Sequence, residues 1–233
     1  IRLSLVGSEM CIRDSFYSVP GSSTLILKEG VTSNPSLGNR LSPGAVKYKD
    51  QDGDGVITTK DRTVIGNALP KWYGGITNTF NYKGIDFSFM LQFNYGNDIY
   101  NATRLYATQT NTQRRNQLAE VADRWSPTNA SNKVPRYNGY VVNDVYSRFV
   151  EDGSFLRLKN ITLGYTLPHK WTRSFHVSKL RVYATGQNLF CLNNYSGYDP
   201  EVSTASKSPM TPGLDWGAYP KSRVFTFGID LQF

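Results

Sequence analysis

The residues best suited to chemistry form an acidic, glycine-containing loop between residues 50 and 61. Its sequence, Asp-Gln-Asp-Gly-Asp-Gly-Val-Ile-Thr-Thr-Lys-Asp, places carboxylates at loop positions 1, 3, 5 and 12 and a glycine at position 6. This spacing is typical of a calcium loop, in which alternate oxygens converge on one hard cation. The predicted ligands are Asp50, Asp52, Asp54, the carbonyl of Val56, Thr58 directly or through water, and Asp61.

The flanks of this loop differ from those of an EF-hand. Residues 45 to 49 alternate like a strand, and residues 63 to 66 do not begin a long amphipathic helix. Asp61 also stands where an EF-hand carries the longer glutamate, which makes bidentate coordination harder to reach. We therefore expect a structural Ca²⁺ loop without a helix pair, and an empty acidic turn is the alternative.

The composition gives little support to other kinds of chemistry. The two histidines and the two cysteines, Cys11 and Cys191, form neither a CxxC metal motif nor a disulfide framework. The chain has 26 Lys and Arg against 18 Asp and Glu, a net charge of +8. These cations are scattered rather than gathered in the stripe of a nucleic-acid site. We predict a protein that is not an enzyme and binds no nucleic acid.

The last eleven residues, 223–233, alternate strictly between two kinds of side chain. As a period-two strand, this segment presents one continuous apolar face and one mostly polar face. The pattern predicts a closing strand of a transmembrane β-barrel. Its apolar, aromatic end is the kind of signal that an outer-membrane assembly machine reads. The predicted signal residues are Phe225, Phe227, Ile229, Leu231 and Phe233.

Similar alternation recurs upstream, over membrane-crossing lengths of about 9 to 11 residues. The predicted strands are 72–82, 85–95, 155–167 and 179–192, and Lys83-Gly84 supplies a hairpin turn between the first two. In 155–167, Arg157 and Lys159 fall on the same side as Ile161. Because a charge on the lipid face costs about 2 to 4 kcal/mol at mid-bilayer, we expect that half of the strand to rise clear of lipid.

Long loops separate these strands at one end and short links join them at the other. The long segments are 16–47, 96–154 and 193–221, and a short amphipathic helix is expected at 117–125. Outer-membrane barrels have short periplasmic turns and long outer loops, so the acidic loop should lie outside. Loop position alone marks seven candidates for substrate or lid contact. They are Tyr100, Tyr106, Trp125, Tyr137, Tyr195, Tyr198 and Trp216.

From about residue 16 to residue 233, the chain resembles the carboxy-terminal end of SusC/RagA-like TonB-linked outer-membrane receptors. Residues 1–15 do not match this pattern, and we expect them to lie outside the fold, a short strand or connection being the alternative. The segments that carry the resemblance are 47–57 with Asp61-Arg62, Ile65-Gly66 with Pro70, 155–168, 186–189 and 195–201.

The resemblance implies an all-β, antiparallel up-and-down meander, the last five strands of a 22-stranded transmembrane barrel with long extracellular loops. It also implies an importer of glycans or peptides in the outer membrane of a Gram-negative bacterium. TonB, acting through an amino-terminal part absent from this chain, would energise it, and a SusD-like lipoprotein would close over the substrate. The alternative is a secreted, calcium-dependent carbohydrate-binding β-sandwich, whose strands should be nearer about 5 or 6 residues.

Overall fold

The computed structural model describes residues 4–6, 16–18, 25–27, 43–46, 48–110, 116–137, 139, 145–202 and 212–233. Most of the segments 1–15 and 16–47 therefore lies outside the described residues. The chain divides into two compact units. The loop unit comprises residues 1–68, 98–151 and 202–217, and the sheet unit comprises residues 69–97, 152–201 and 218–233.

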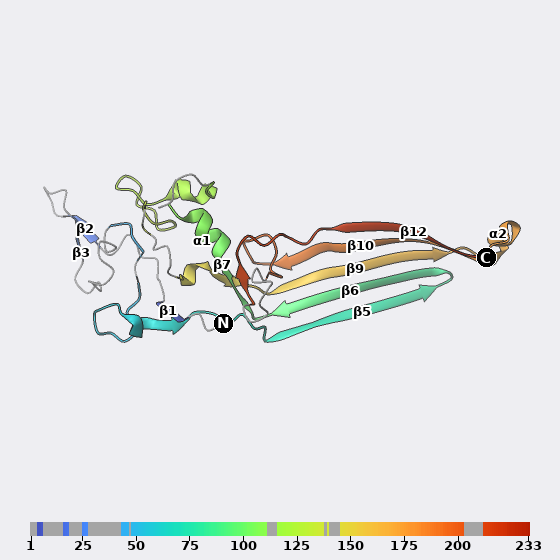
Figure 1. The fold of residues 1–233 in the computed structure, drawn as a ribbon, viewed down its shortest axis with the longest axis horizontal. Helices are drawn as coiled ribbons and strands as arrows, with labels where there is room; N and C mark the ends of the chain where they lie inside the picture. The colour runs from blue at the N-terminus through green and yellow to red at the C-terminus, as the bar shows by residue number, and fades with distance from the viewer. Residues whose placement is uncertain are drawn as a thin grey trace. The chain divides into compact units, whose positions relative to one another are not determined.

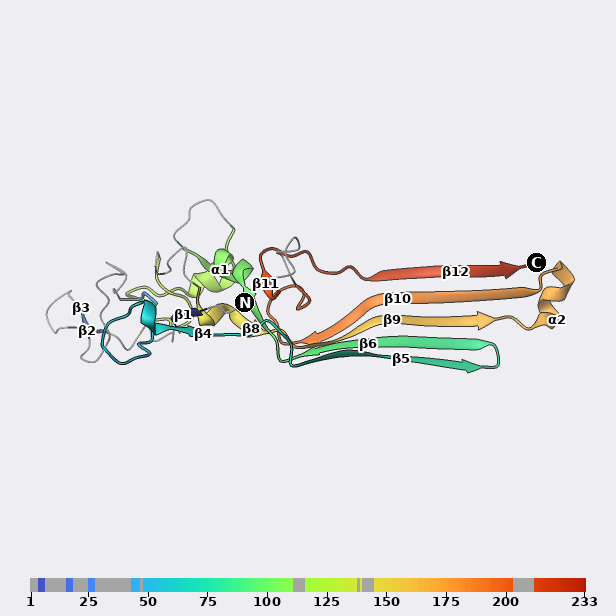
Figure 2. The ribbon, with the colours of Figure 1, turned by 60° about the horizontal axis from the view of Figure 1, so that its bottom comes forward.

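Five long strands make up the sheet unit (Figure 1). They are β5 (Trp72–Tyr82), β6 (Ile85–Tyr95), β9 (Phe155–Thr166), β10 (Lys179–Asn193) and β12 (Val224–Gln232). They pair antiparallel in the order β12-β10-β9-β6-β5, so strands that follow one another along the chain within this unit are neighbours (Figure 2). The predicted up-and-down meander is confirmed. Strands of 9 to 15 residues are longer than those expected of the sandwich alternative.

The tightest connection joins β5 to β6 through Lys83 and Gly84. Both residues have positive φ, 46° and 86°, which is the requirement of a type I′ hairpin turn. The register follows directly, because Tyr82 then pairs with Ile85 and the ladder runs unbroken to Trp72 and Tyr95.

Cross-strand partners share a face, so the register defines an apolar face and a polar face. Described side chains do not cover the apolar face at β12, where Phe225, Phe227 and Ile229 are 65 to 80% exposed. The apolar face comprises Trp72, Ile76, Phe80 and Tyr82 of β5, Ile85, Phe87, Phe89, Leu91, Phe93 and Tyr95 of β6, Leu156, Leu158, Ile161, Leu163 and Tyr165 of β9, Leu180, Val182, Ala184, Phe190 and Leu192 of β10, and Phe225, Phe227, Ile229 and Leu231 of β12.

A register shift in β9 corrects the expected placement of Arg157. Met90 pairs with Asn160 but Leu91 pairs with Leu158, which leaves Lys159 as an extra, unpaired residue. Such a bulge reverses the alternation on one side of it. Arg157 therefore pairs with Gln92 on the polar face and does not share the face of Ile161, so the prediction that it does was wrong.

An ion cluster crosses the polar face near the hairpin turn. The Arg181 guanidinium donates to Asp86 of β6 over 2.9 and 2.6 Å and to Asp230 of β12 over 2.9 Å. Gly164 lies beneath it on β9, where a Cβ would overlap the Asp86 carboxylate. The cluster thus joins three strands and depends on a glycine in a fourth.

The connection from β9 to β10 folds into α2 (His169–Thr172) and a 3₁₀ turn, Arg173–Phe175. His176 then ends the turn in the left-handed conformation with φ 56°. The N–H of Ser178 donates to the carbonyl of Gln232 over 2.7 Å, so this connection is tied to the end of β12. Among the described residues, no helix is long and apolar enough to cross a membrane.

The loop unit has its own small core. Val46, Tyr48, Ile57, Tyr100, Ala102, Leu105, Tyr146 and Phe149 form this cluster. Its elements are β1 (Ser4–Val6) paired with β4 (Arg62–Val64), β2 (Phe16–Ser18) paired with β3 (Leu25–Leu27), a sheet of β7 (Asp98–Asn101), β8 (Val150–Asp152) and β11 (Leu214–Asp215), the helix α1 (Ala102–Thr108), and 3₁₀ turns at Thr59–Asp61, Ala119–Asp123 and Ser147–Phe149.

Two expectations for the loop unit were wrong. Residues 45, 46, 48 and 49 are not in a strand, although Val46 and Tyr48, which would share one face of such a strand, are both buried in the core. The helix expected at 117–125 is a 3₁₀ turn of five residues, in which Val121 is the buried residue. The helix α1, at Ala102–Thr108, was not predicted.

The hairpin turn gives a first prediction. Gly84→Ala should destabilise the protein by about 1 to 2 kcal/mol, the cost of a left-handed L-residue, or more. The added Cβ would also lie 2.7 Å from the carbonyl oxygen of Thr166. Thermal melting in detergent measures the effect. Lys83→Asn is the control, because asparagine tolerates positive φ, and equal losses in the two variants would contradict the turn assignment.

Candidate functional site

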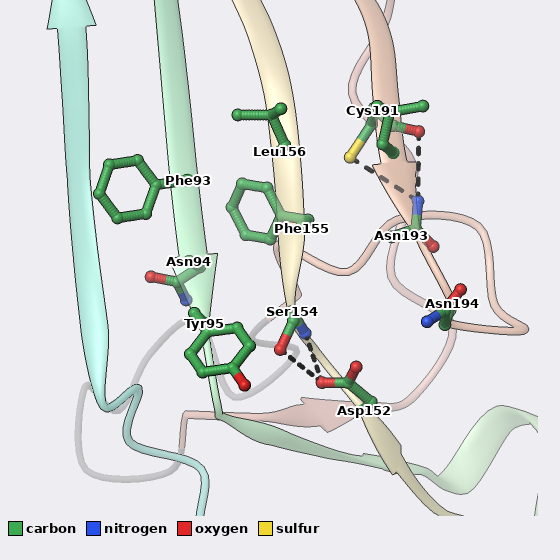
Figure 3. A pocket seen from close by; sticks show the side chains of 11 residues that line it. Phe93, Asn94, Tyr95, Asp152, Ser154, Phe155, Leu156, Cys191, Asn193 and Asn194 are labelled. Atoms are coloured by element: carbon green, nitrogen blue, oxygen red, sulfur yellow. Dashed lines mark hydrogen bonds between the residues drawn. The ribbon is translucent and has the colours of Figure 1, made fainter.

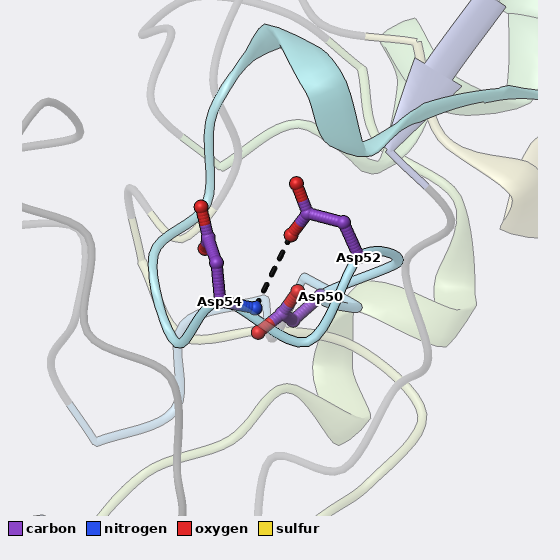
Figure 4. A group of neighbouring side chains, drawn as sticks. All are labelled: Asp50, Asp52 and Asp54. Atoms are coloured by element: carbon purple, nitrogen blue, oxygen red, sulfur yellow. Dashed lines mark hydrogen bonds between the residues drawn. The ribbon is translucent and has the colours of Figure 1, made fainter.

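Three carboxylates of the acidic loop converge in the structure (Figure 4). One oxygen from each of Asp50, Asp52 and Asp54 lies within 4.8 Å of the other two. Oxygens bound to one Ca²⁺ at 2.3–2.6 Å stand at most about 5 Å apart. The spacing therefore fits a single calcium ion.

Backbone N–H groups of the loop fix these carboxylates. Asp50 accepts from the N–H groups of Gly53 and Gly55 over 2.7 and 2.8 Å. Asp52 accepts from Asp54 N–H over 3.2 Å, and Asp54 accepts from Val56 N–H over 2.8 Å. These local bonds fold the loop back on itself and keep the three side chains together, with Asp52 and Asp54 exposed and Asp50 partly buried.

Asp61 is more deeply buried than these three carboxylates and lies beside Asp50 and Asp52. It is fully buried, and its two oxygens accept from the N–H groups of Thr58 and Gln51 over 2.6 and 2.8 Å. These two bonds, that of Thr58 first, lower the pKa of the Asp61 carboxyl. Thr58 in turn accepts from Lys60 N–H over 3.1 Å. In this arrangement Asp61 joins the start of the loop to its end.

Two of the seven aromatic candidates meet in the loop unit. Tyr106 of α1 and Trp216, which follows β11, have ring centroids 5.6 Å apart at an interplanar angle of 54°. They are 42% and 57% exposed. Beside them is a cavity of about 330 Å³, and the described residues that line it carry no charge. Its other lining residues are Ala102, Thr103, Ala107, Asn116 and Gly217.

The remaining candidates are dispersed. Tyr100 and Tyr195 are buried, and Tyr100 belongs to the core cluster. Trp125 is partly buried and packs so closely on Gly44 that a Cβ there would overlap its ring. Tyr137 and Tyr198 are exposed. Only Tyr106 and Trp216 among the seven share a described cavity.

A charged network holds α1 in place beneath this cavity. Arg104 donates to both oxygens of Glu120 over 2.9 Å each and to Glu151 over 3.3 Å. The Thr103 hydroxyl contacts the Asp215 carboxylate over 3.1 Å and accepts from Gly217 N–H over 2.6 Å. The same helix is thus linked to the segment that carries Trp216. The bonds from Arg104 lower the pKa of Glu120.

A second cavity, of about 780 Å³, lies in the sheet unit where β6, β9 and β10 end (Figure 3). Ser154 donates to Asp152 through its hydroxyl and its N–H, over 2.5 and 2.9 Å. The Asn193 amide donates to the carbonyl of Cys191 over 3.4 Å. Sequence reasoning missed this cavity, because its lining comes from the ends of separate strands.

A buried ion cluster lies at the same end of the sheet. The side chains of Arg157 and Asp199 are 4% and 7% exposed and form an ion pair. Glu201 joins Arg157 over 3.6 Å, Lys159 over 3.5 Å and Lys221 over 2.5 Å. Asp199 also accepts from the N–H of Glu201 over 2.9 Å. The cluster therefore holds the segment after β10 against β9.

Comparison with curated proteins identifies relatives of this chain. It is 36% identical over 202 residues to TonB-dependent receptor P3 and 38% identical over 195 residues to TonB-dependent receptor P26, both of Formosa agariphila. It is 32% identical over 188 residues to TonB-dependent receptor SusC of Bacteroides thetaiotaomicron. These matches cover 80 to 85% of this chain, which spans only 17 to 20% of the length of these relatives. No family model matches.

Solved structures agree on the fold. The RagAB peptide transporter matches with a TM-score of 0.68 at 22% identity, over 94% of this chain and 25% of that chain. The RagAB peptide importer in the 'open-open' state matches with a TM-score of 0.66. These curated relatives are named TonB-dependent receptors, one of them SusC, which confirms the resemblance to SusC/RagA-like receptors recognised in the sequence.

The buried ion pair gives a second prediction. Arg157→Leu leaves Asp199 buried without its partner, so it should destabilise the intact receptor by about 3 to 5 kcal/mol. It should also expose residues 194–202 to protease. Lys221→Gln is the control, because it removes a more exposed ion pair worth about 1 kcal/mol or less. Melting and limited proteolysis measure both variants, and equal effects would contradict a dominant role for Arg157.

The network beneath the cavity gives a third prediction, of pH dependence. The pKa of Glu120 in the folded protein is below its ordinary value. The stabilisation from ionised Glu120 is therefore fully present at a pH above that ordinary pKa and is lost as the pH falls through the folded pKa. Between pH 6 and pH 3, the free energy of unfolding of the wild type should fall by about 1 kcal/mol more than that of Glu120→Gln, which has no carboxyl to protonate. Melting curves of the intact receptor across this window test it, and identical pH slopes in both proteins would refute it.

Proposed function

We propose that this chain is part of an outer-membrane TonB-dependent importer and that its sheet unit forms part of the barrel wall. The observation that carries the proposal is the meander of strands of 9 to 15 residues with one exposed apolar face, in a chain related to TonB-dependent receptors. The apolar face would contact lipid and the polar face would line the interior.

The unpaired edges of the described sheet support closure into a barrel. The strands β5 and β12 are the edges of the described sheet, and an unpaired backbone edge in lipid costs several kcal/mol for each group. We propose that the five strands are the last of 22 in a barrel of the plugged-transporter size, and that β5 and β12 pair with other strands of the same receptor.

Substrate and partners are proposed from the relatives. One relative is named SusC and the solved structures are of a peptide importer. Because the SusC/RagA resemblance implies glycans or peptides, the proposed cargo is an oligosaccharide or a peptide. A SusD-like lipoprotein would cover the outer, long-loop end, and TonB would energise uptake from the opposite side. The relatives are named as receptors or importers, so we propose no catalytic role. The uncharged cavity beside Tyr106 and Trp216 suits a neutral part of the cargo.

Uptake in the native bacterium tests this function. Deleting the receptor gene should abolish uptake of either labelled oligosaccharides or labelled oligopeptides, and removing TonB should do the same. Complementation with Tyr106→Ala plus Trp216→Ala should restore the barrel but weaken cargo binding by about 10-fold or more, as the loss of two stacking aromatics predicts. Tyr219→Ala, which is 91% exposed outside the candidate set, is the control. Undiminished uptake without the receptor or without TonB would contradict the function.

For the acidic loop, we propose a structural calcium ion bound by Asp50, Asp52 and Asp54, with the Val56 carbonyl and Thr58 completing the shell. Asp61 remains the ligand predicted at loop position 12, and the hydrogen bonds that it accepts from the N–H groups of Gln51 and Thr58 would also hold the ends of the loop together. Calcium would supply only charge neutralisation and loop order there.

Calorimetry and melting of the intact receptor test the metal proposal. At a calcium concentration 100 times Kd, binding should stabilise the loop unit by about 2.7 kcal/mol. Asp52→Asn plus Asp54→Asn should remove both the heat and the stabilisation. Asp123→Asn, a carboxylate outside the loop, should keep them, and a wild-type receptor with neither signal would rule out the ion.

A further inference from the structure

One end of the sheet unit carries exposed cations without acidic partners. This turn end consists of the Lys83-Gly84 turn and the link 168–178, which contains no Asp or Glu. Lys83, Lys170 and Arg173 are exposed. Within the described residues, none of these three takes part in an ion pair.

At the opposite end of the same sheet, three cations, Arg157, Lys159 and Lys221, are paired with Asp199 and Glu201. Two further cations of that end, Lys71 and Arg223, are exposed. The nearest carboxylates to the turn end on the polar face, Asp86 and Asp230, are both engaged by Arg181. The turn end therefore has a surplus of positive charge that its own side chains do not neutralise.

Exposed aromatic rings accompany these cations. Trp171 is 63% exposed and Tyr82 is 67% exposed, while the Lys83 ammonium lies 5.2 Å from the centroid of the Tyr82 ring. Within α2, Thr172 is buried and its hydroxyl donates to the carbonyl of His169 over 3.3 Å. Figures 1 and 2 show α2 at the end of the sheet, beside the end of β12. Amphipathic rings next to cations are the chemistry of a membrane–water interface.

We propose that the turn end binds the headgroups of anionic glycerophospholipids. The phosphates would accept hydrogen bonds from Lys83, Lys170 and Arg173, and Trp171 would lie at the level of the headgroups. This inference rests on the proposed function, because it requires the apolar face to be in lipid. Short connections lie on the periplasmic side of such barrels, so the lipid belongs to the leaflet on that side.

Native mass spectrometry of the intact receptor in detergent tests the inference. Phosphatidylglycerol and phosphatidylcholine with the same acyl chains are titrated separately, and phosphatidylglycerol should bind more tightly. Lys170→Gln plus Arg173→Gln should weaken phosphatidylglycerol binding by about 25-fold, or about fivefold for each charge. The control is Lys71→Gln plus Arg223→Gln, which removes two exposed cations at the opposite end and should leave the affinity within about twofold.

Three results would overturn the inference. They are equal binding of both lipids by the wild type, equal losses in the variant and the control, and displacement of the lipid by inorganic phosphate, which would indicate a general anion site. Heat-modifiable migration on a gel is recorded for every variant. A folded barrel without lipid preference overturns only this inference, whereas a wild-type receptor without a folded barrel overturns the proposed function with it.

Discussion

The backbone ladder across β12, β10, β9, β6 and β5 is the interaction on which the rest of the sheet unit depends. Its register decides which side chains face which way, because a shift of one residue exchanges the two faces of a strand. This register is maintained by the long strands, by the two-residue hairpin and by Gly164 beneath Arg181. A sheet of this kind exposes many apolar side chains, and that exposure is stable only where lipid replaces water.

The ion-paired side chains of the sheet unit lie at its two ends. At the long-loop end, the bulge at Lys159 turns Arg157 onto the polar face, where its pairing with Asp199 holds the following segment. At the turn end, Arg181 forms ion pairs with both Asp86 and Asp230. The exposed cations of that end have no ion-pair partner among the described residues. In the loop unit, the Arg104 network instead fixes a short helix beside the Tyr106–Trp216 cavity.

Much of the sheet could be predicted from the sequence, since period-two alternation persists through residues 72–82, 85–95 and 179–187 with a glycine at the turn. The bulge could not, because one extra residue leaves no compositional mark and Arg157 and Lys159 look alike in the pattern. The proximity of the Asp50, Asp52 and Asp54 carboxylates could be predicted, because the three residues are close in sequence. The pairing of Tyr106 with Trp216, 110 positions apart in the chain, and the burial of Tyr100 and Tyr195 depend on tertiary contacts that local spacing does not encode.

The central claim is that one face of this sheet meets lipid and the other meets water. Single cysteines in the intact receptor, with Cys191 and any other native cysteine replaced by serine, test it in reconstituted vesicles with a water-soluble maleimide. Cysteines at Ser88 and Thr226 on the polar face should react, and those at their neighbours Phe89 and Phe227 on the apolar face should be protected. Equal reaction at neighbouring positions in both strands would contradict the account.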